Sequence, residues 1–293
     1  MHAKTYRVGS AEISRIDELT LGNFTPSMLF PAWAERHASR LPLLPDTVTA
    51  DGNHLPLHVH GWLIRDRGRT ILVDTAVGNH KERPYAPYFH RLETPFLRHL
   101  AEAGVAPDDV DYVLSTHLHV DHTGWNTWLE NGVWVPTFPK ARYLFSRQEY
   151  LFFTDPVNHS ERNRTSFQVQ IDSVTPVIEA GLAEMIAVTG QEVIAGFSFH
   201  PTPGHTGNHA TIILESQGEY AVFSGDVLHH PVQVADPGLF SVFDPERDKT
   251  LRSRRWALDY AADHDALFCS SHFPSTSAGR VRRRDVGYEW QFQ

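Results

Sequence analysis

Residues 115–126 read STHLHVDHTGWN, and this stretch decides the fold. It brings four ionisable side chains into six residues, namely His117, His119, Asp121 and His122. The apolar residues 112–114 directly before it are typical of a buried strand. Imidazole nitrogen and carboxylate oxygen are both good ligands for zinc and related divalent ions. The stretch therefore predicts a metal site at the end of a strand.

The geometry of such a turn suggests how the four side chains are shared between two metal positions. A strand that runs into a tight turn can direct alternate side chains to one point, so His117 and His119 can share one ion. Asp121 and His122 lie behind them and face a second position. The alternative is that all four are structural residues with ordinary hydrogen bonds. Because four such residues seldom fall at this spacing by accident, the sequence favours a metal site.

The run HLHVDH at residues 117–122 resembles the His-x-His-x-Asp-His signature of the metallo-β-lactamase superfamily. The resemblance continues upstream in Leu-Val-Asp-Thr at residues 72–75 and near the end in Ser-His-Phe-Pro at residues 271–274. It therefore spans most of the chain. It implies an α/β protein with the four-layer αβ/βα sandwich of the metallo-β-lactamase fold. We expect residues 1–293 to form a single domain of this kind.

The composition limits the class of protein. Hydrophobic residues make up 41% and charged residues 21% of the 293 residues, which is ordinary for a globular enzyme. The net charge of -9 argues against nucleic acid or an anionic membrane as the main partner. The single Cys269 excludes an internal disulfide and a cysteine-rich zinc site. The sequence shows neither a leader nor an apolar run of membrane-spanning length, so we expect a cytoplasmic protein.

Turn and cap signals place the remaining elements. Residues 58–64 and 70–73 are strand-like and flank a turn at Gly68, which predicts a hairpin. Thr94 and Pro95 predict a helix start with the threonine as cap. The proline-bearing, apolar residues 21–45 are either a wall or lid of a substrate pocket, a subunit contact in a homodimer, or a loop packed on the core.

Asp74 ends the second strand of that hairpin and has two interpretations. In the resembled family this aspartate lies behind the metal site, where its carboxylate can orient a ligand histidine through the other ring nitrogen. Alternatively, it caps a helix.

Three further residues complete the ligand set that the resemblance implies. His205, Asp226 and His272 each follow a strand-like run and lie in a loop with glycine or proline nearby. Each matches a position where the family has a ligand. The resemblance implies one ion held by His117, His119 and His205. It implies a second held by Asp121, His122 and His272, with Asp226 bridging the two.

Such a centre implies hydrolysis. Two cations can lower the pKa of a bridging water to about 7, which supplies hydroxide at neutral pH. We expect zinc, with manganese, iron(II) or cobalt as alternatives. The family implies that Asp121 also accepts the proton of the nucleophile. His229, three residues after Asp226, either donates a hydrogen bond to the substrate oxygen that gathers charge or packs within its loop.

Departures from other members narrow the branch. The absence of a ligand cysteine argues against β-lactam hydrolysis. Residues 225–233 resemble the corresponding run of methyl parathion hydrolase, while lactonases that quench quorum sensing have Tyr where this chain has His229. We expect hydrolysis of a small, neutral, fairly apolar carboxylic ester or lactone, with a phosphotriester as the alternative. An alternative of another class is a non-catalytic metal-binding module.

Overall fold

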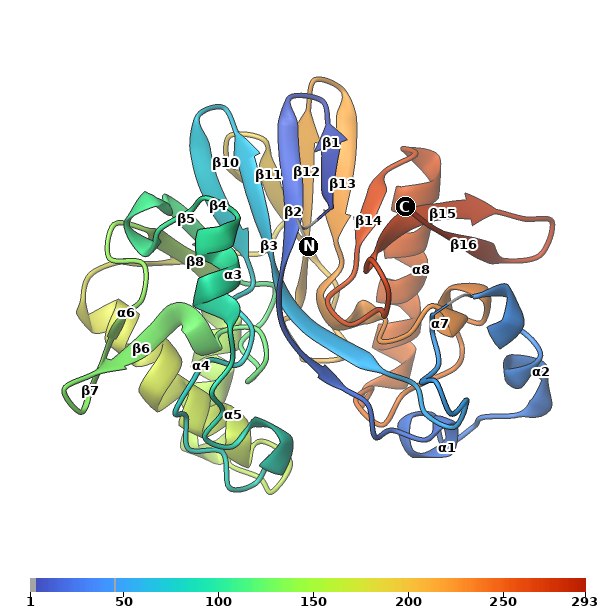
Figure 1. The fold of residues 1–293 in the computed structure, drawn as a ribbon, viewed down its shortest axis with the longest axis horizontal. Coiled ribbons are helices and arrows are strands. Elements are labelled where there is room, and N and C mark those ends of the chain that lie inside the picture. Colours follow the sequence, from blue (N-terminus) through green and yellow to red (C-terminus); the bar gives the residue numbers. More distant parts are fainter. Residues whose placement is uncertain (1–3, 45) are drawn as a thin grey trace. The chain divides into compact units, whose positions relative to one another are not determined.

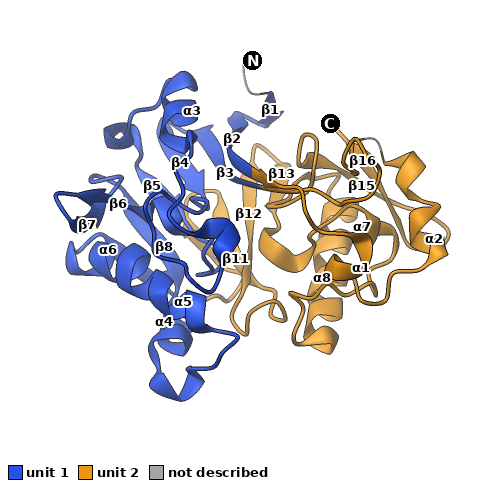
Figure 2. Cartoon of the chain, turned by 60° about the horizontal axis from the view of Figure 1, so that its bottom comes forward, with its two compact units in different colours: residues 1–19, 59–187 blue, residues 20–58, 188–293 orange. Residues whose placement is uncertain are grey.

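The computed structural model describes residues 4–44 and 46–293, so residues 1–3 and Pro45, the last residue of the predicted loop, lie outside the described residues. The chain divides into two compact units, each made of two separate segments (Figure 2). Unit 1 comprises residues 1–19 and 59–187, and unit 2 comprises residues 20–58 and 188–293. That residues 1–293 form a single domain stays a prediction. No helix among the described residues is both long and apolar enough to cross a membrane.

The sheet of unit 1 has seven strands in the order β1-β2-β3-β4-β5-β8-β9 (Figure 1). Their bounds are β1 Thr5–Val8, β2 Ala11–Leu21, β3 Leu57–Asp66, β4 Arg69–Val73, β5 Tyr112–Leu114, β8 Arg142–Ser146 and β9 Ala183–Ile186. The predicted hairpin joins β3 to β4 through Arg67 and Gly68, both at positive φ. Strands β4, β5, β8 and β9 are parallel. Their carboxyl ends therefore meet at one edge, where Asp74 and the metal motif follow β4 and β5.

The helices of unit 1 pack on this sheet through one apolar core. They are α3 Phe96–Glu102, α4 Arg147–Thr154, α5 Arg164–Val169, a π-helical segment Gln170–Val174 and α6 Thr175–Glu179, with 3-10 turns at Pro87–Phe89, Pro107–Asp109, Gly124–Asn126 and Pro156–Asn158. Phe96 and Phe153 from the helices share a buried cluster with Val113 of the sheet. The hairpin of β6 Thr127–Glu130 and β7 Val133–Pro136 was not predicted.

The predicted helix after Pro95 forms, but its cap is different. Pro95 occupies the cap position, with no side-chain cap bond. The hydroxyl of Thr94 instead donates to Oε1 of Glu18, at 2.8 Å, and to Oδ1 of Asn79, at 2.9 Å. The prediction of a Thr94 cap was therefore wrong, because the hydroxyl donates to the buried carboxylate of Glu18 in β2 instead of capping the helix.

The sheet of unit 2 also has seven strands, in chain order from β10 to β16. Their bounds are β10 Glu192–Ile194, β11 Phe197–Pro201, β12 Ala210–Ser216, β13 Glu219–Phe223, β14 Leu267–Cys269, β15 Ala278–Arg283 and β16 Tyr288–Phe292. Strands β13 and β14 are parallel, so Asp226 and His272 follow strands that end at the same edge. Helix α8 Arg247–Asp263 packs on the sheet through Ala257, Leu258 and Ala261.

The apolar residues 21–44 pack onto the core of unit 2. They contain α1 Pro26–Leu29, α2 Glu35–Ala38 and a 3-10 turn Leu41–Leu43. Leu29 and Phe30 are fully buried in a cluster with Leu55, Val232 and Leu239. The turn at α7 Val232–Ala235 belongs to the same layer. The alternative of a loop packed on the core is thus confirmed for its middle part. Both units consist of a sheet with helices, as the α/β class predicts.

Candidate metal centre

The metal motif of unit 1 gathers its four side chains as the sequence predicts. The ring of His117 lies 4.7 Å from that of His119 and 4.1 Å from that of His122, measured between centroids. Nε2 of His122 lies 3.7 Å from Oδ1 of Asp121. Unit 1 therefore presents three imidazoles and a carboxylate at the carboxyl end of β5.

Asp74 orients one of these histidines. Its Oδ2 accepts a hydrogen bond from Nδ1 of His122 at 2.8 Å. Its carboxylate also accepts the backbone amide and the hydroxyl of Thr116, at 2.8 and 2.9 Å. No helix begins within the three described residues after Asp74, so the capping alternative was wrong. The proton on Nδ1 leaves Nε2 of His122 as the nitrogen with a lone pair, which is the form that binds metal.

Backbone contacts lock the motif to the segment after β4. The amide of Thr75 donates to the carbonyl of His122 at 2.7 Å, and the amide of Gly124 donates to the carbonyl of Ala76 at 2.7 Å. A Cβ on Gly124 would lie 1.7 Å from the carbonyl oxygen of Val77, so only glycine fits there. The approach of these two backbones sets the position of the ligand turn.

A buried carboxylate that sequence reasoning missed supports the same segment. Glu18 of β2 accepts the amides of Val77 and Gly78 at 2.6 and 3.1 Å and the indole Nε1–H of Trp125 at 2.6 Å. Burial raises its pKa above the usual value, although these hydrogen bonds oppose the rise. No motif marks Glu18, because these partners lie at least 59 residues away along the chain.

The ligand candidates of unit 2 converge on one carboxylate. Oδ2 of Asp226 lies 3.3 Å from Nε2 of His205 and 3.5 Å from Nε2 of His229. Its Oδ1 lies 3.0 Å from Nε2 of His272. All four residues are buried. The structure thus brings together the three residues that the resemblance implied as ligands in this unit and places His229, the predicted donor, beside them.

His272 shows that this cluster suits a cation. Its Nδ1 lies 2.8 Å from the carbonyl oxygen of His58, which can only accept, so Nδ1 carries the proton. In the neutral ring, Nε2 then presents a lone pair to the Asp226 carboxylate. Two acceptors at 3.0 Å repel each other unless a proton or a metal ion lies between them. Nitrogen and carboxylate donors in this arrangement fit a divalent ion such as zinc, as does the triad of His205, Asp226 and His229.

His229 is held by a polar chain on its far side. Its Nδ1 lies 3.4 Å from the hydroxyl of Ser241, which donates to Oδ2 of Asp244 at 3.0 Å. The hydroxyl of Ser241 thus joins the His229 ring to the Asp244 carboxylate. The ring of Phe243 covers the same imidazole at 5.3 Å between centroids. Ser241 and Phe243 therefore fix the orientation of the His229 ring.

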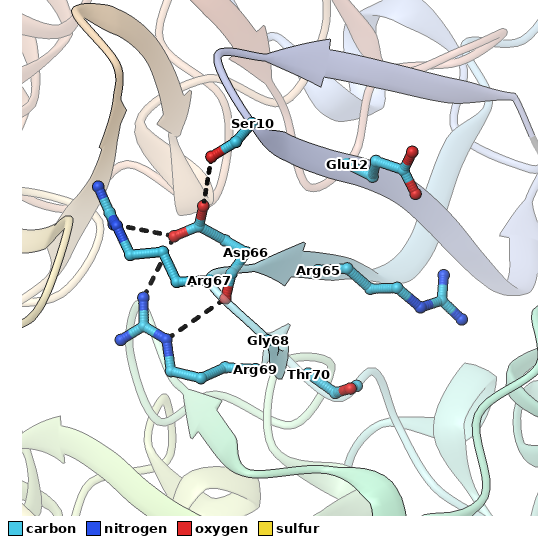
Figure 3. A pocket seen from close by; sticks show the side chains of 8 residues that line it. All are labelled: Ser10, Glu12, Arg65, Asp66, Arg67, Gly68, Arg69 and Thr70. Atoms are coloured by element: carbon cyan, nitrogen blue, oxygen red, sulfur yellow. Dashed lines mark hydrogen bonds and ion pairs between the residues drawn. The ribbon is translucent and has the colours of Figure 1, made fainter.

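A pocket at the β3–β4 hairpin is a second feature of unit 1 (Figure 3). Its lining carries Arg65, Arg67 and Arg69. Arg67 and Arg69 both donate to Oδ2 of the buried Asp66, at 2.9 and 3.2 Å. Much of the positive charge is compensated within the pocket, and none of the predicted ligands lines it.

Comparisons with known proteins identify the family and several relatives of this chain. The family profile described as Metallo-beta-lactamase superfamily matches residues 54–272. The N-acyl homoserine lactonase AiiA of Bacillus thuringiensis subsp. kurstaki is 26% identical over 67% of this chain and 74% of its own length. The N-acyl homoserine lactonase AttM of Agrobacterium fabrum is 24% identical over 75% of this chain and 81% of its own.

Solved structures agree in fold. A hydrolase of the β-lactamase superfamily, AbOPH, matches with a TM-score of 0.82 and 23% identity, over 100% of this chain and 97% of its own. AidC, a dizinc quorum-quenching lactonase in complex with a product, matches with a TM-score of 0.77 and 22% identity, over 99% and 97%. At these low sequence identities the structural similarity shows only that the folds are alike.

Proposed function

This chain belongs to the metallo-β-lactamase superfamily, and from that membership we propose that it hydrolyses lactones or carboxylic esters of small, neutral, fairly apolar molecules. The resemblance carried by residues 117–122 and the metallo-β-lactamase fold are confirmed. The protein is a metal-dependent hydrolase that acts on ester or lactone bonds. The choice of a lactone rests on the relatives AiiA and AttM, which are N-acyl homoserine lactonases.

The proposed centre is dinuclear, with the ligand assignment that the family resemblance implies. We assign one ion to His117, His119 and His205, a second to Asp121, His122 and His272, and Asp226 to both. The matched residues 54–272 include every one of these positions, and the structural neighbour AidC is a dizinc enzyme. Zinc is the proposed metal, since all the ligands are imidazole or carboxylate. The observation that carries the proposal is the convergence of three Nε2 atoms on Asp226, with the proton of His272 held on Nδ1.

Different residues of this chain have different roles in the proposed hydrolysis. When bound, two divalent ions supply the nucleophile by lowering the pKa of water and polarise the carbonyl under attack. Asp121 accepts the proton of the nucleophile and passes it to the leaving oxygen. His229 donates a hydrogen bond to the substrate oxygen that gathers charge, and Ser241 contacts its ring. Asp74 keeps the ring of His122 in its ligating orientation.

An aromatic series in unit 2 supports an apolar substrate. The ring of Phe24 meets that of Phe243 edge to face at 6.0 Å, and Phe243 lies 5.3 Å from His229. Residues 21–44 therefore reach the ligand cluster through their first aromatic residue. We propose that Phe24 and Phe243 form the apolar wall against which the acyl chain of the substrate packs.

The test is a substrate panel with zinc-loaded protein. It compares N-acyl homoserine lactones of increasing chain length with p-nitrophenyl esters and an aryl dialkyl phosphotriester. We expect the highest kcat/KM for a lactone or carboxylic ester, complete loss on chelation, and recovery with zinc. If the phosphotriester has the highest kcat/KM, the alternative substrate class is correct and the proposed one is wrong. No metal-dependent turnover of any member, with two zinc ions bound, would overturn the proposal.

A further inference from the structure

A closed circuit of hydrogen bonds surrounds the turn that carries Asp226. The backbone amide of Asp226 donates to Nε2 of His209 at 2.9 Å. Nδ1 of His209 lies 2.9 Å from the hydroxyl of Thr202, which lies 3.1 Å from the hydroxyl of Thr211. Thr211 donates to the carbonyl of Ser224 at 3.4 Å. The circuit thus begins and ends on the same turn, at residues 226 and 224.

The direction of every bond in this circuit follows from one atom. A backbone amide can only donate, so Nε2 of His209 must accept and cannot carry a proton. The proton of the neutral ring is therefore on Nδ1 and is donated to Thr202. Because Thr202 accepts from the ring, its own proton is free for Thr211, whose proton goes to the Ser224 carbonyl. All four residues besides Asp226 are at most 1% exposed, so water does not compete for these bonds.

The turn needs such support because its backbone is unusual. Gly225 has a φ of 52°, and Asp226 has φ −101° and ψ 27°, outside the helical region although it lies in a 3-10 turn. These angles direct the Asp226 carboxylate at His205 and His272. A small rotation at Gly225 would move the carboxylate away from both.

We propose that His209 is a positioning residue for Asp226, acting through the circuit with Thr202 and Thr211. The inference rests on the proposed function in taking Asp226 as a metal ligand. His209 holds the amide of Asp226, and the two threonines fix both the tautomer of His209 and the carbonyl two residues before. His209 itself supplies no ligand atom, because its Nε2 is engaged by the amide.

Two substitutions of His209 separate this role from simple packing. The side-chain amide of glutamine reaches the position of Nε2 and can accept the Asp226 amide, whereas that of asparagine reaches only the position of Nδ1. We therefore compare His209→Gln with His209→Asn, and Thr211→Val, which opens the circuit at its other end. His200, on the neighbouring strand β11, serves as the control with the same pair of substitutions.

The first readout is hydrogen exchange of peptides covering residues 225–227 in metal-free protein. We expect wild-type protection in His209→Gln and faster exchange in His209→Asn. The second is zinc affinity from competition with a chelator. We expect a loss of about 10- to 100-fold in His209→Asn, a smaller loss in Thr211→Val, and near wild-type affinity in His209→Gln and both His200 variants.

The outcomes separate the two proposals. Equal exchange and equal zinc affinity in His209→Gln and His209→Asn would overturn the positioning role. If His209→Asn fails to fold, unchanged exchange and affinity in Thr211→Val would overturn it instead. A wild-type chain that binds no zinc would overturn the proposed function, while the exchange of the metal-free protein would still decide the role of His209.

Discussion

Nδ1 of His122 donates to Oδ2 of Asp74 across 2.8 Å, although the two residues are 48 positions apart. The same carboxylate accepts two hydrogen bonds from Thr116, so it cannot rotate without losing three partners. The pair therefore fixes which nitrogen of His122 is left for a metal. It also raises the basicity of that nitrogen.

The first prediction concerns this pair. Asp74→Asn should weaken zinc binding by about 10- to 100-fold, because an amide cannot accept all three of the donors that face it. Zinc affinity from chelator competition measures the effect. Asp111→Asn is the control, because Oδ2 of Asp111 also accepts a backbone amide, that of Thr70, in an exposed position. Wild-type affinity in Asp74→Asn would contradict the orienting role.

Metal content is the second prediction. Protein purified without chelator and supplied with zinc should contain about two equivalents by elemental analysis, since the proposed ligands form two sets, one for each ion. Chelation should abolish ester hydrolysis, and added zinc should restore it. A single equivalent that excess zinc does not raise would rule out the dinuclear assignment.

The apolar wall gives the third prediction. Phe24→Ala should raise KM for long-chain esters and lactones by about tenfold, the loss expected when an aromatic side chain that packs against the substrate is removed, without changing zinc content. Trp33→Ala is the comparison, because Trp33 stacks on Phe30 at 6.0 Å and packs against His37. It should lower the melting temperature and leave KM nearly unchanged. The opposite pattern would mean that Trp33, and not Phe24, contacts the substrate.

His229 carries the fourth prediction. His229→Ala should lower kcat by about 10² to 10³ with both zinc ions retained, because a donor to the developing oxyanion is lost. His229→Tyr replaces it with a hydroxyl donor and should recover turnover of lactones before that of phosphotriesters. If His229→Ala instead loses zinc in proportion to activity, the residue is a ligand and the donor role is wrong.

The fifth prediction is a pH dependence of stability. Lys81 is buried beside Asp172, with its ammonium 3.7 Å from the ring centre of Trp134. Burial lowers its pKa to about 7, Asp172 opposes the shift, and Arg83 adds to it. The unfolded chain, with a lysine pKa of about 10.4, therefore binds more protons between pH 7 and 10. The free energy of unfolding should rise with pH in this window by at most about 1.4 kcal/mol per unit.

Lys81→Met provides the measurement for that prediction. The difference in unfolding free energy between wild type and Lys81→Met, from urea titrations at several pH values, should become more favourable to wild type from pH 7 to 10. Other groups titrate in both proteins and cancel in the difference. A difference that does not change with pH would show that Lys81 stays charged in the folded protein.

The ligand motifs could be predicted from the sequence because their chemistry is local. His117, His119 and His122 fall within a run of six residues shortly after one strand, and His205 lies in a loop marked by two prolines and two glycines. Parallel strands then place Asp74 beside the motif and His272 beside Asp226. From the sequence, the resemblance to the family implied these positions, and the strand order seen in the structure gives the physical reason for them.

The supporting contacts could not be predicted in the same way. Glu18 binds the amides of Val77 and Gly78, and His209 binds the amide of Asp226. A backbone amide is present at every residue except proline, so no residue type marks the partner in the sequence. The π-helical segment Gln170–Val174 was missed for a related reason, because its polar residues show little periodicity although several are buried.

The contact between Gly124 and Val77 bears on protein engineering. Since the ligand turn fits only against residues 75–78, the twelve residues 115–126 are not a portable metal-binding peptide. A designer who grafts them onto another sheet must also transfer the neighbouring strand end, with Asp74 and an acidic residue equivalent to Glu18. The transferable unit is a pair of strand ends, and its smallest working form is set by backbone shape as much as by ligand identity.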